Sequence, residues 1–589
     1  MTIFDVLSMI GGLALFLYGM HLLSEGLERV SGGRLERILE KMTNSKWKGV
    51  LLGAGVTAVI QSSSATTVMV VGFVNSGIMK LSQAIGVIMG ANIGTTATAW
   101  ILSLSGLESD NFWVQMLKPT SFCPILAIIG IVFIMFLKDS KKKDLGMIFV
   151  GFAILMFGMD SMSDAMKPLS SMPEFTQLFV MFSNPILGLL VGAILTAIIQ
   201  SSSASVGILQ ALCQTGSVSF GSAIPIIMGQ NIGTCITAIM SAVGAAKNAK
   251  RASVVHLMFN VIGTTVFMIV FYTANAIVDF AFLDDAANAA GIATVHTAFN
   301  IMTTCLLLPF SKGLEKLSTI IVKRDEEEDR QDANAAKRFR FDDRFLNSPS
   351  FALEQANTRV MEMAEITKES LDQATSLFFN YDKGIAKEVE EKEQLVDHYD
   401  DEISSYLMKL SAKNLSEDDS KKLTILLHTI GDLERISDHA LNLVDAAADL
   451  NKKEQGFSAK AIEELHIFTK AVMDIVAMSV EVFKNEDIIM ARTVEPFEEA
   501  IDAIQKEMKK RHKKRLNKGK CTVEMGFALS EITNNYERIA DHCSNIAISV
   551  MQLKEVETHA HEYVDNIQKG EGSDFDLRYQ NFLKKYDLP

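Results

Sequence analysis

Gln61-Ser62-Ser63-Ser64-Ala65 is followed 139 positions later by the identical peptide Gln200-Ser201-Ser202-Ser203-Ala204. A second element keeps the same spacing, because Ala84–Thr96 (AIGVIMGANIGTT) is echoed by Ala223–Cys235 (AIPIIMGQNIGTC). A third pair, Gly19-Met20 and Gly158-Met159, also fits. The stretch from about residue 12 to about residue 238 is therefore a tandem duplication without a net insertion.

Both Ser-rich peptides lie in parts of the chain that are otherwise nearly all apolar. Amide and hydroxyl groups are costly in lipid unless they face each other or a wet cavity. A doubled membrane unit with a polar break in each half is the usual sequence indication of a transporter's substrate site. Small residues that merely ease helix packing are the plainer interpretation, but the duplication of a whole peptide argues against it.

The chain has 589 residues and changes composition near residue 323. The residues before that point are apolar and rich in Gly, Met, Ala and Ile, and those after it are charged. The sequence therefore predicts an all-α protein with a membrane domain over residues 1–322, a charged linker over 323–349 and a soluble helical domain over 350–553. Residues 554–589 form a tail to which the sequence assigns no role.

Composition also excludes several classes of protein. The net charge of −14 averages two unlike halves, and the absence of a basic stripe argues against nucleic-acid binding. The six cysteines are scattered without a C-x-x-C pair, so neither a zinc site nor a disulfide framework is indicated. Residues 1–23 lack a basic start and a cleavage site, which favours a retained membrane helix over a signal peptide.

Hydropathy predicts seven membrane crossings, near residues 3–23, 82–104, 118–138, 144–162, 221–243, 253–279 and 291–310. The segments 48–76 and 187–215 differ, since each holds two short apolar stretches around a Gln-Ser-Ser-Ser peptide. Such stretches are too short for a hydrocarbon core of ~30 Å. We therefore expect two re-entrant helical hairpins, one in repeat one (about 3–140) and one in repeat two (about 142–280), followed by an extra helix.

Loop charges predict the orientation. The loops on one side carry Lys and Arg, namely Arg29, Arg34, Arg37, Lys41, Lys46 and Lys48 in 24–48, the four lysines of 138–143, and Lys247, Lys250 and Arg251. The loops 105–117, 163–186 and 280–289 on the other side hold a single basic residue, Lys167. The positive-inside rule then places the N-terminus outside and the C-terminal domain in the cytoplasm of a multi-pass cell-membrane protein. Three crossings per repeat would invert the second copy.

The chemistry of the two motif regions is almost free of charge. Between Gly49 and Ser103 the only Asp, Glu, Lys or Arg is Lys80, and between Gly188 and Ala246 there is none. Hydroxyl and amide oxygens can ligate sodium, while hydroxyl donors and helix N-termini can hold an oxyanion. Without a nearby cation, a divalent anion would need two or more sodium ions with it. Proton coupling through His256, His296 or Asp160 is the alternative, although each suits a structural role better.

The doubled Gln-Ser-Ser-Ser motif, each copy followed by Gly-x-Asn-Ile-Gly-Thr, resembles the sodium/phosphate cotransporter family (type II) over roughly residues 5–315. The resemblance implies inorganic phosphate as substrate, sodium as the coupling ion and inverted repeats. Thr66-Thr67 becomes Ser205-Val206 and Thr96 becomes Cys235, which leaves the number of sodium ions open. By motif, the implied substrate and sodium ligands are Gln61, Ser62, Ser63, Ser64, Thr66, Asn92, Thr95, Thr96, Gln200, Ser201, Ser202, Ser203, Asn231 and Thr234.

The soluble half contains a second duplication, in which Leu433–His439 (LERISDH) resembles Tyr536–His542 (YERIADH). Glu-x-x-x-Asp sets two carboxylates on one helix face, and facing helices of a bundle would gather four of them, enough for a di- or trinuclear metal cluster. A solvated acidic face is the alternative. The carboxylates concerned are Glu393, Asp397, Glu434, Asp438, Glu498, Asp502, Glu537 and Asp541.

These motifs resemble the PhoU family over about residues 350–553. That resemblance implies two three-helix bundles, a divalent, iron or zinc cluster, and a regulatory rather than a catalytic domain. Our hypothesis is that this domain senses phosphate status or a cytoplasmic partner protein and gates the transporter. A sodium-coupled phosphate transporter is therefore the first hypothesis, and a symporter of another oxyanion or a transporter-like phosphate receptor is the alternative. No Gly-x-Ser-x-Gly or Walker A motif favours an enzyme or an ATP-driven pump. Transport direction and oligomeric state, a homodimer included, stay open.

Overall fold

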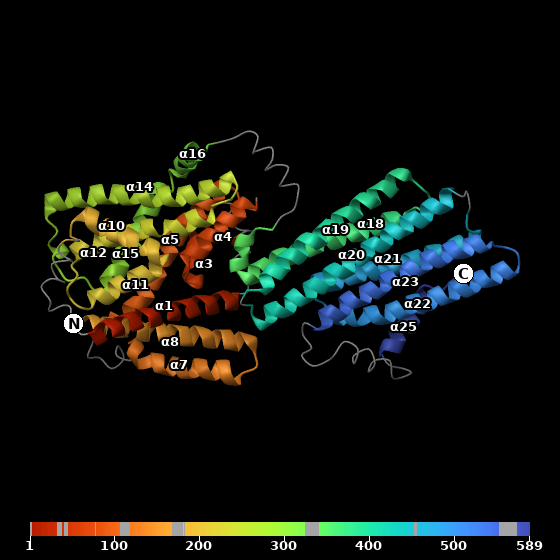
Figure 1. Cartoon of the computed structure of the whole chain (residues 1–589), viewed down its shortest axis with the longest axis horizontal. Coiled ribbons are helices and arrows are strands. Elements are labelled where there is room, and N and C mark those ends of the chain that lie inside the picture. The colour runs from red at the N-terminus through yellow and green to blue at the C-terminus, as the bar shows by residue number, and fades with distance from the viewer. Residues whose placement is uncertain are drawn as a thin grey trace. The chain divides into compact units, whose positions relative to one another are not determined.

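The computed structural model describes residues 3–31, 38–39, 45–76, 78–106, 118–167, 181, 183–323, 341–413, 415–452, 456–552 and 574–589. Arg34, Arg37 and Lys41, most of the charged linker (324–340) and residues 554–573 of the tail lie outside them. The described chain is helical, and its one β-bridge joins Ser219 to Ala286. It forms two compact units, Met1–Phe351 and Ala352–Pro589 (Figure 1).

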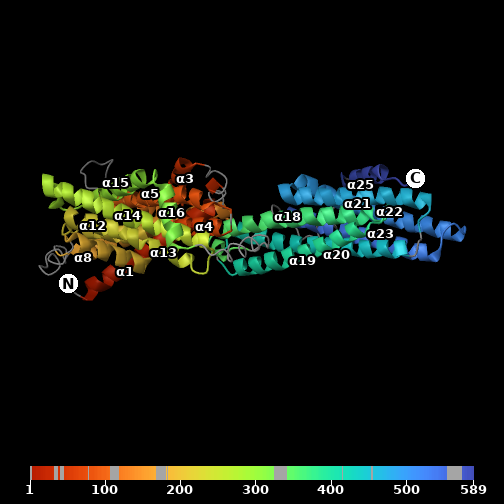
Figure 2. The same ribbon diagram turned by 90° about the horizontal axis from the view of Figure 1, so that it is seen from above.

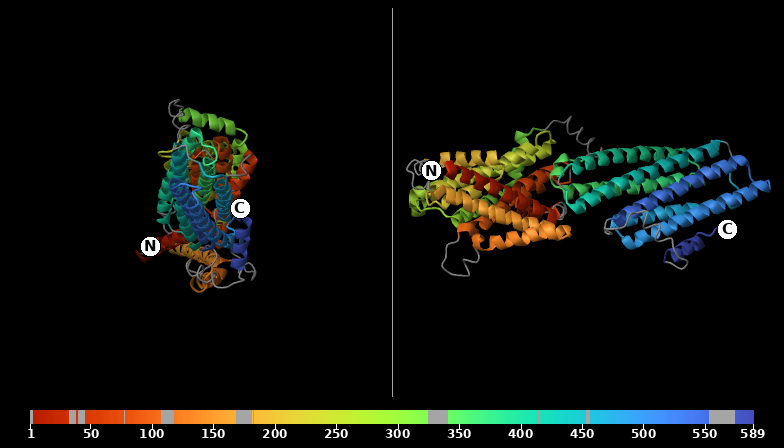
Figure 3. Two further views of the ribbon diagram at one scale, coloured as in Figure 1. Left: turned by 90° about the vertical axis from the view of Figure 1, so that its right-hand side faces the viewer. Right: turned by 60° about the horizontal axis from the view of Figure 1, so that its bottom comes forward.

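The helices α1 (Ile3–Ser31) and α8 (Ser140–Met166) occupy equivalent places in the two repeats and pack against each other (Figure 3). A Cβ on Gly19 would lie 2.2 Å from the nitrogen of Leu155, and one on Gly158 would lie 2.3 Å from the nitrogen of Phe16. Only glycine permits such contact between two backbones. Because successive glycines of α1 meet earlier and earlier turns of α8, these helices run antiparallel, as inverted repeats would require.

Each Gln-Ser-Ser-Ser peptide interrupts a pair of short helices, α3 (Lys46–Ile60) with α4 (Ser63–Asn75), and α10 (Pro185–Ile199) with α11 (Ser202–Cys213). Gln61 and Gln200 end the first helix of each pair with φ of 61° and 60°. The next residue, Ser62 or Ser201, caps the second helix by accepting a hydrogen bond from Ala65 or Ala204, 3.2 Å in both cases. The predicted break is therefore confirmed in both copies, whereas re-entry from the membrane surface stays a prediction.

Two long helices support these broken pairs, α5 (Leu81–Ser103) beside α3 and α12 (Phe220–Gly233) beside α10. A Cβ on Gly90 would lie 2.1 Å from the carbonyl oxygen of Val50, and one on Gly229 would lie 2.0 Å from that of Leu189. These glycines thus allow a close approach of two backbones in both copies. The supporting helix is interrupted only in the second copy, where α12 continues past Thr234 as α13 (Cys235–Ser241).

The first unit is completed by α7 (Pro119–Phe136), α14 (Lys247–Val278), α15 (Ala289–Leu307) and α16 (Ser311–Ile321), and by the 3-10 turns η1 (Leu104–Gly106), η3 (Ala281–Leu283) and η4 (Asp343–Asn347). Six helices of the described chain are long and apolar enough to span a membrane: α1, α5, α8, α12 with α13, α14 and α15. The seventh predicted crossing corresponds to α7, a shorter apolar helix that packs on α8.

The second unit is a pair of three-helix bundles. The first contains α18 (Pro349–Ser376), α19 (Lys383–Ser411) and α20 (Glu417–Lys452), and the second contains α21 (Ala459–Asn485), α22 (Ile488–Asn517) and α23 (Val523–Gln552). The bundles meet where α20 packs on α23. The end of the tail, to which the sequence assigned no role, forms α25 (Asp574–Lys585) on α22, with Phe582 stacked 4.1 Å from Phe497 (Figure 2).

Candidate functional site

The two Ser-rich breaks form one cavity of 210 Å³, called here the central cavity. Its polar wall consists of residues from both copies, Gln61, Ser62, Ser63, Ser64, Ser201, Ser202 and Ser203, and α1 contributes Leu17, Met20, His21 and Ser24. No Lys, Arg, Asp or Glu is among these residues of the described chain. The structure thus brings together seven of the fourteen residues implied by the sequence motifs.

The helices α4 and α11 both begin at this cavity, at Ser63 and Ser202. The first turn of a helix presents unpaired N–H groups and the positive end of the helix dipole. These donors, together with the serine hydroxyls, suit an oxyanion, while the same hydroxyl oxygens can ligate sodium. The arrangement can therefore hold an anion and a cation side by side.

Two threonines join the copies at the breaks, and the sequence analysis missed both. Thr98 of α5 donates to Oε1 of Gln61 at 2.8 Å and lies 3.4 Å from the hydroxyl of Ser203. Its counterpart 139 positions later, Thr237 of α13, lies 3.4 Å from the hydroxyl of Ser64. Each copy's threonine thus reaches the other copy's third serine. The shared spacing of Thr98-Ala99 and Thr237-Ala238 is a signal that could have identified them.

A second cavity, of 350 Å³, adjoins the central one at Ser64. Gln200 lines this second cavity rather than the central one, together with Thr237 of α13 and Arg344 and Phe345 of η4. The sequence analysis predicted no site residue as far along the chain as Arg344. The cavity lies wholly within the first unit.

The remaining motif residues, Thr66, Asn92, Thr95, Thr96, Asn231 and Thr234, are buried but line neither cavity. The side chains of all six donate hydrogen bonds to backbone carbonyls three or four residues earlier. Asn92 and Asn231, for example, donate to Ile88 and Ile227 at 3.0 Å each. In this conformation they shape the helices around the breaks, and a direct role as ligands stays a prediction.

The proton-relay candidates lie elsewhere. His256 in α14 and His296 in α15 are each 1 % exposed, and neither lines the central or the second cavity. Asp160, in α8, is absent from both linings as well. The structural roles that the sequence analysis preferred for these three residues stay a prediction.

The eight predicted metal carboxylates lie on two helix pairs, α19 with α20 and α22 with α23. Burial raises the pKa of Glu393, and Asp438 of the facing helix adds to the shift. Burial, followed by Glu495 and Asp541, raises the pKa of Glu498 to about 9. The four carboxylates of each set therefore repel one another, and a bound cation would reduce this repulsion. No group of three or more such side chains in the described chain is arranged to hold a metal, so the metal site stays a prediction.

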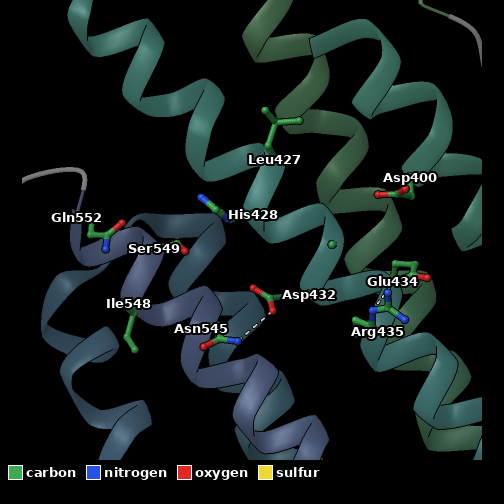
Figure 4. Close-up of a pocket in the computed structure, with 11 residues that line it drawn as sticks. Asp400, Leu427, His428, Asp432, Glu434, Arg435, Asn545, Ile548, Ser549 and Gln552 are labelled. Atoms are coloured by element: carbon green, nitrogen blue, oxygen red, sulfur yellow. Dashed lines mark hydrogen bonds and ion pairs between the residues drawn. The ribbon is translucent and has the colours of Figure 1, made fainter. Parts of the chain in front are cut away.

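A polar pocket of 680 Å³ lies where the two bundles meet, between α20 and α23 (Figure 4). Asp432 on α20 is its centre, since its Oδ1 lies 2.9 Å from Nδ1 of His542 and accepts from Asn545 at 3.3 Å. The equivalent pair of the duplication, His439 and Asn535, lies 2.8 Å apart. These side chains join the bundles through hydrogen bonds that the sequence analysis did not predict.

The comparisons with known proteins agree with both halves of this description. A family model described as Na+/Pi-cotransporter matches residues 15–164 and 154–303, and a PhoU domain model matches residues 360–447 and 466–550. The overlap of the first two ranges reflects the duplication. The PhoU crystal structure from Pseudomonas aeruginosa is 21% identical, with a TM-score of 0.33, and covers 34% of this chain and 96% of that one.

Three curated relatives span different parts of the chain. The "Putative inorganic phosphate export protein YjbB" of Escherichia coli (strain K12) is 23% identical over 564 residues, 95% of this chain and 99% of that protein. The "Uncharacterized protein YqeW" of Bacillus subtilis (strain 168) is 31% identical over 308 residues, 52% of this chain and 95% of that protein. The sodium-dependent phosphate transport protein 2A of Rattus norvegicus is 41% identical over 99 residues, 16% of this chain and 15% of that protein.

Proposed function

Because the chain belongs to the Na+/Pi-cotransporter family and carries a PhoU domain, we propose that it is a secondary transporter that moves inorganic phosphate together with sodium ions across the cell membrane. The observation that carries this proposal is the central cavity, where both Gln-Ser-Ser-Ser breaks supply hydroxyls and helix N-termini but no Lys or Arg.

The charge balance of that cavity explains why sodium would accompany phosphate. Phosphate carries one to two negative charges near neutral pH, and dehydrating an anion without a compensating cation is costly. The serine hydroxyls Ser62–Ser64 and Ser201–Ser203 offer oxygens to a hard cation on the same wall that offers donors to the anion. Two or more sodium ions would neutralise the bound anion and so link the two fluxes. The similarity to the rat sodium-dependent phosphate transport protein 2A supports this coupling.

The proposal extends to the residues and to the orientation. The fourteen motif residues would act as ligands or as their immediate supports, and Thr98 and Thr237 would hold the two breaks together. The basic loops favour an external N-terminus and a cytoplasmic PhoU domain. The name of the Escherichia coli relative refers to export, so the proposal assigns no net direction of transport.

For the PhoU domain we propose a regulatory role with a bound divalent, iron or zinc cluster. Glu393, Asp397, Glu434 and Asp438 would hold metal in one bundle, and Glu498, Asp502, Glu537 and Asp541 would hold it in the other. The mutual electrostatic repulsion within each set supports the assignment. The metal would supply positive charge that stabilises the acidic helix faces. A cytoplasmic protein partner could then bind to these faces.

Labelled-phosphate flux into proteoliposomes tests the transport proposal. We expect uptake by the intact protein to follow an imposed sodium gradient, and Ser63→Ala and Ser202→Ala to reduce it, because each removes a hydroxyl from the central cavity. Thr294→Ala is the matched control, since that exposed hydroxyl donates to the carbonyl of Ala290 in its own helix and lines neither cavity. Phosphate uptake that ignores every cation gradient would refute sodium coupling.

A further inference from the structure

The segment from Asp342 to Phe351, which follows the charged linker, is built into the first unit. It comprises η4 and the first turn of α18. The ring of Phe345 lies 5.5 Å from Phe73 of α4 and 5.0 Å from Phe351, and Phe351 lies 5.1 Å from Phe73. Phe345 is 3 % exposed and Phe351 is fully buried. This aromatic cluster fixes the segment to the helix that begins at Ser63 of the first break.

Gly72 of α4 allows the cluster to pack closely. A Cβ added to Gly72 would lie 2.7 Å from the ring of Phe345, so the ring would have to shift to admit a larger residue. The segment therefore packs at a defined position on the first unit, although it lies outside both sequence repeats.

Arg344, in the middle of this segment, is held by three contacts. Its Nε donates to Oδ1 of Asp342 at 2.7 Å and its Nη1 donates to the carbonyl of Ser241 at 3.2 Å. Asp342 also accepts from the backbone nitrogen of Arg344 at 3.0 Å, and its other oxygen accepts from Asn75 of α4 at 2.9 Å. These contacts fix the guanidinium beside the end of α13.

Arg344 thereby lines the second cavity together with residues of both breaks. Ser64, Gln200 and Thr237 line that cavity with Arg344. Ser64 also lines the central cavity, so the two spaces adjoin at this residue. Among the residues of the described chain that line these two cavities, Arg344 is the one Lys or Arg.

We propose that the second cavity is a vestibule of the phosphate pathway and that Arg344 contacts the phosphate there, before it enters or after it leaves the central cavity. The inference rests on the proposed transport function. A guanidinium has five N–H donors in a plane that matches phosphate oxygens. Two of these donors are used by Asp342 and Ser241, and both contacts orient the group.

The pairing with Asp342 sets how strongly the vestibule binds phosphate. An anion close to Arg344 is also repelled by the carboxylate of Asp342, whose Oδ1 lies 2.7 Å from Nε of Arg344. A site on a transport pathway must bind weakly enough for the ion to leave. The Asp342–Arg344 pair therefore attracts phosphate without trapping it, and the two residues act on the anion with opposite sign.

That opposition gives a test on the full-length protein in proteoliposomes. We expect Arg344→Gln to raise the KM for phosphate roughly tenfold, the loss of one charged contact, with a smaller change in kcat. Arg344→Lys should recover part of the loss. Asp342→Asn keeps a side chain that can cap η4, and it should lower the KM. Lys387→Gln, at an exposed site of the second unit, is the control for the loss of one positive charge.

The same variants should be measured by direct binding of inorganic phosphate to the purified protein. If the wild type binds phosphate but does not transport it, transport is refuted while the opposite shifts of Arg344→Gln and Asp342→Asn still test the vestibule. A purely structural role of the pair predicts that both variants weaken transport together. Equal losses in both, or a KM unchanged in Arg344→Gln, would overturn the assignment.

Discussion

At the scale of single residues, the decisive contacts are the two threonines that cross between the copies. Thr98 and Thr237 each lie 3.4 Å from a serine of the opposite break. We expect Thr98→Val and Thr237→Val to lower phosphate affinity, each by about 1 kcal/mol or roughly fivefold, because the breaks lose their link while the side-chain volume stays similar. Thr→Ser at both positions keeps the hydroxyl and should retain the wild-type KM, as flux measurements can show.

The pKa of a single carboxyl makes a second prediction, in the soluble unit. Burial and neighbouring carboxylates raise the pKa of Glu498 from its ordinary 4.5 to about 9. The folded protein therefore holds a proton that the unfolded chain releases above its ordinary pKa, and stability falls as pH rises toward 9. In the presence of a chelator, the Tm of the wild type should fall as the pH is raised from 6 to 8.5. The Tm of Glu498→Gln should fall less over the same range.

Adding a divalent cation tests whether these carboxylates also form a metal site, because a bound metal would change how the Tm depends on pH. A metal bound by Glu498 and its neighbours would favour the ionised carboxylates, so the Tm at pH 8.5 should rise on adding the metal to the wild type. The same addition to Glu498→Gln should raise it less. Equal responses of both proteins would argue against a metal at this set of carboxylates.

At the scale of helices, glycine contacts decide how the broken pairs sit on their supports. A Cβ on Gly229 would lie 2.0 Å from the carbonyl oxygen of Leu189, a backbone atom that cannot turn aside. We expect Gly229→Ala, and its counterpart Gly90→Ala, to lower the free energy of unfolding by about 1–3 kcal/mol. A lower Tm in detergent would show this loss. Gly55→Ala is the control, since nothing lies within 4 Å of its added Cβ. A Tm equal to that control would mean that α10 and α12 can separate freely.

The helical elements were largely predictable from the sequence because they depend on local and repeated signals. The duplicated peptides indicated both breaks. What the sequence could not supply was side-chain direction. Asn92 carries the motif as clearly as Ser63, yet it bonds to Ile88 of its own helix and faces neither cavity. The rotation of a helix about its axis depends on tertiary packing, which periodicity does not determine in an all-apolar segment.

Arg344 shows the same limit over a longer distance. In the sequence, Arg344 belongs to a charged stretch that we predicted to be a linker. No motif near it in the sequence indicates that it lines a cavity. Its place depends on Phe345 and Phe351 finding Phe73, which is 272 positions before Phe345 in the chain. Such a contact follows from the shape of α4 at Gly72, a property of the folded helix rather than of a motif.

At the scale of the whole molecule, one helix belongs to both units. The first turn of α18 is packed in the first unit through Phe351, and from Ala352 onward the same helix belongs to the second. The chain therefore passes from one unit to the other within α18 rather than within the charged linker.

Two truncations distinguish the contribution of the segment packed at the start of α18 from the contribution of the domain that follows it. A chain ending at residue 351 keeps Phe345 and Phe351 on Phe73, so we expect sodium-dependent flux with a Tm near that of the first unit in the intact protein. A chain ending at residue 340 loses both rings, and burial of one Phe is worth about 1.5–3 kcal/mol. Its Tm should be lower and its KM for phosphate higher, since Arg344 is also gone. Identical behaviour of the two truncations would show that the segment 341–351 contributes neither stability nor substrate contact.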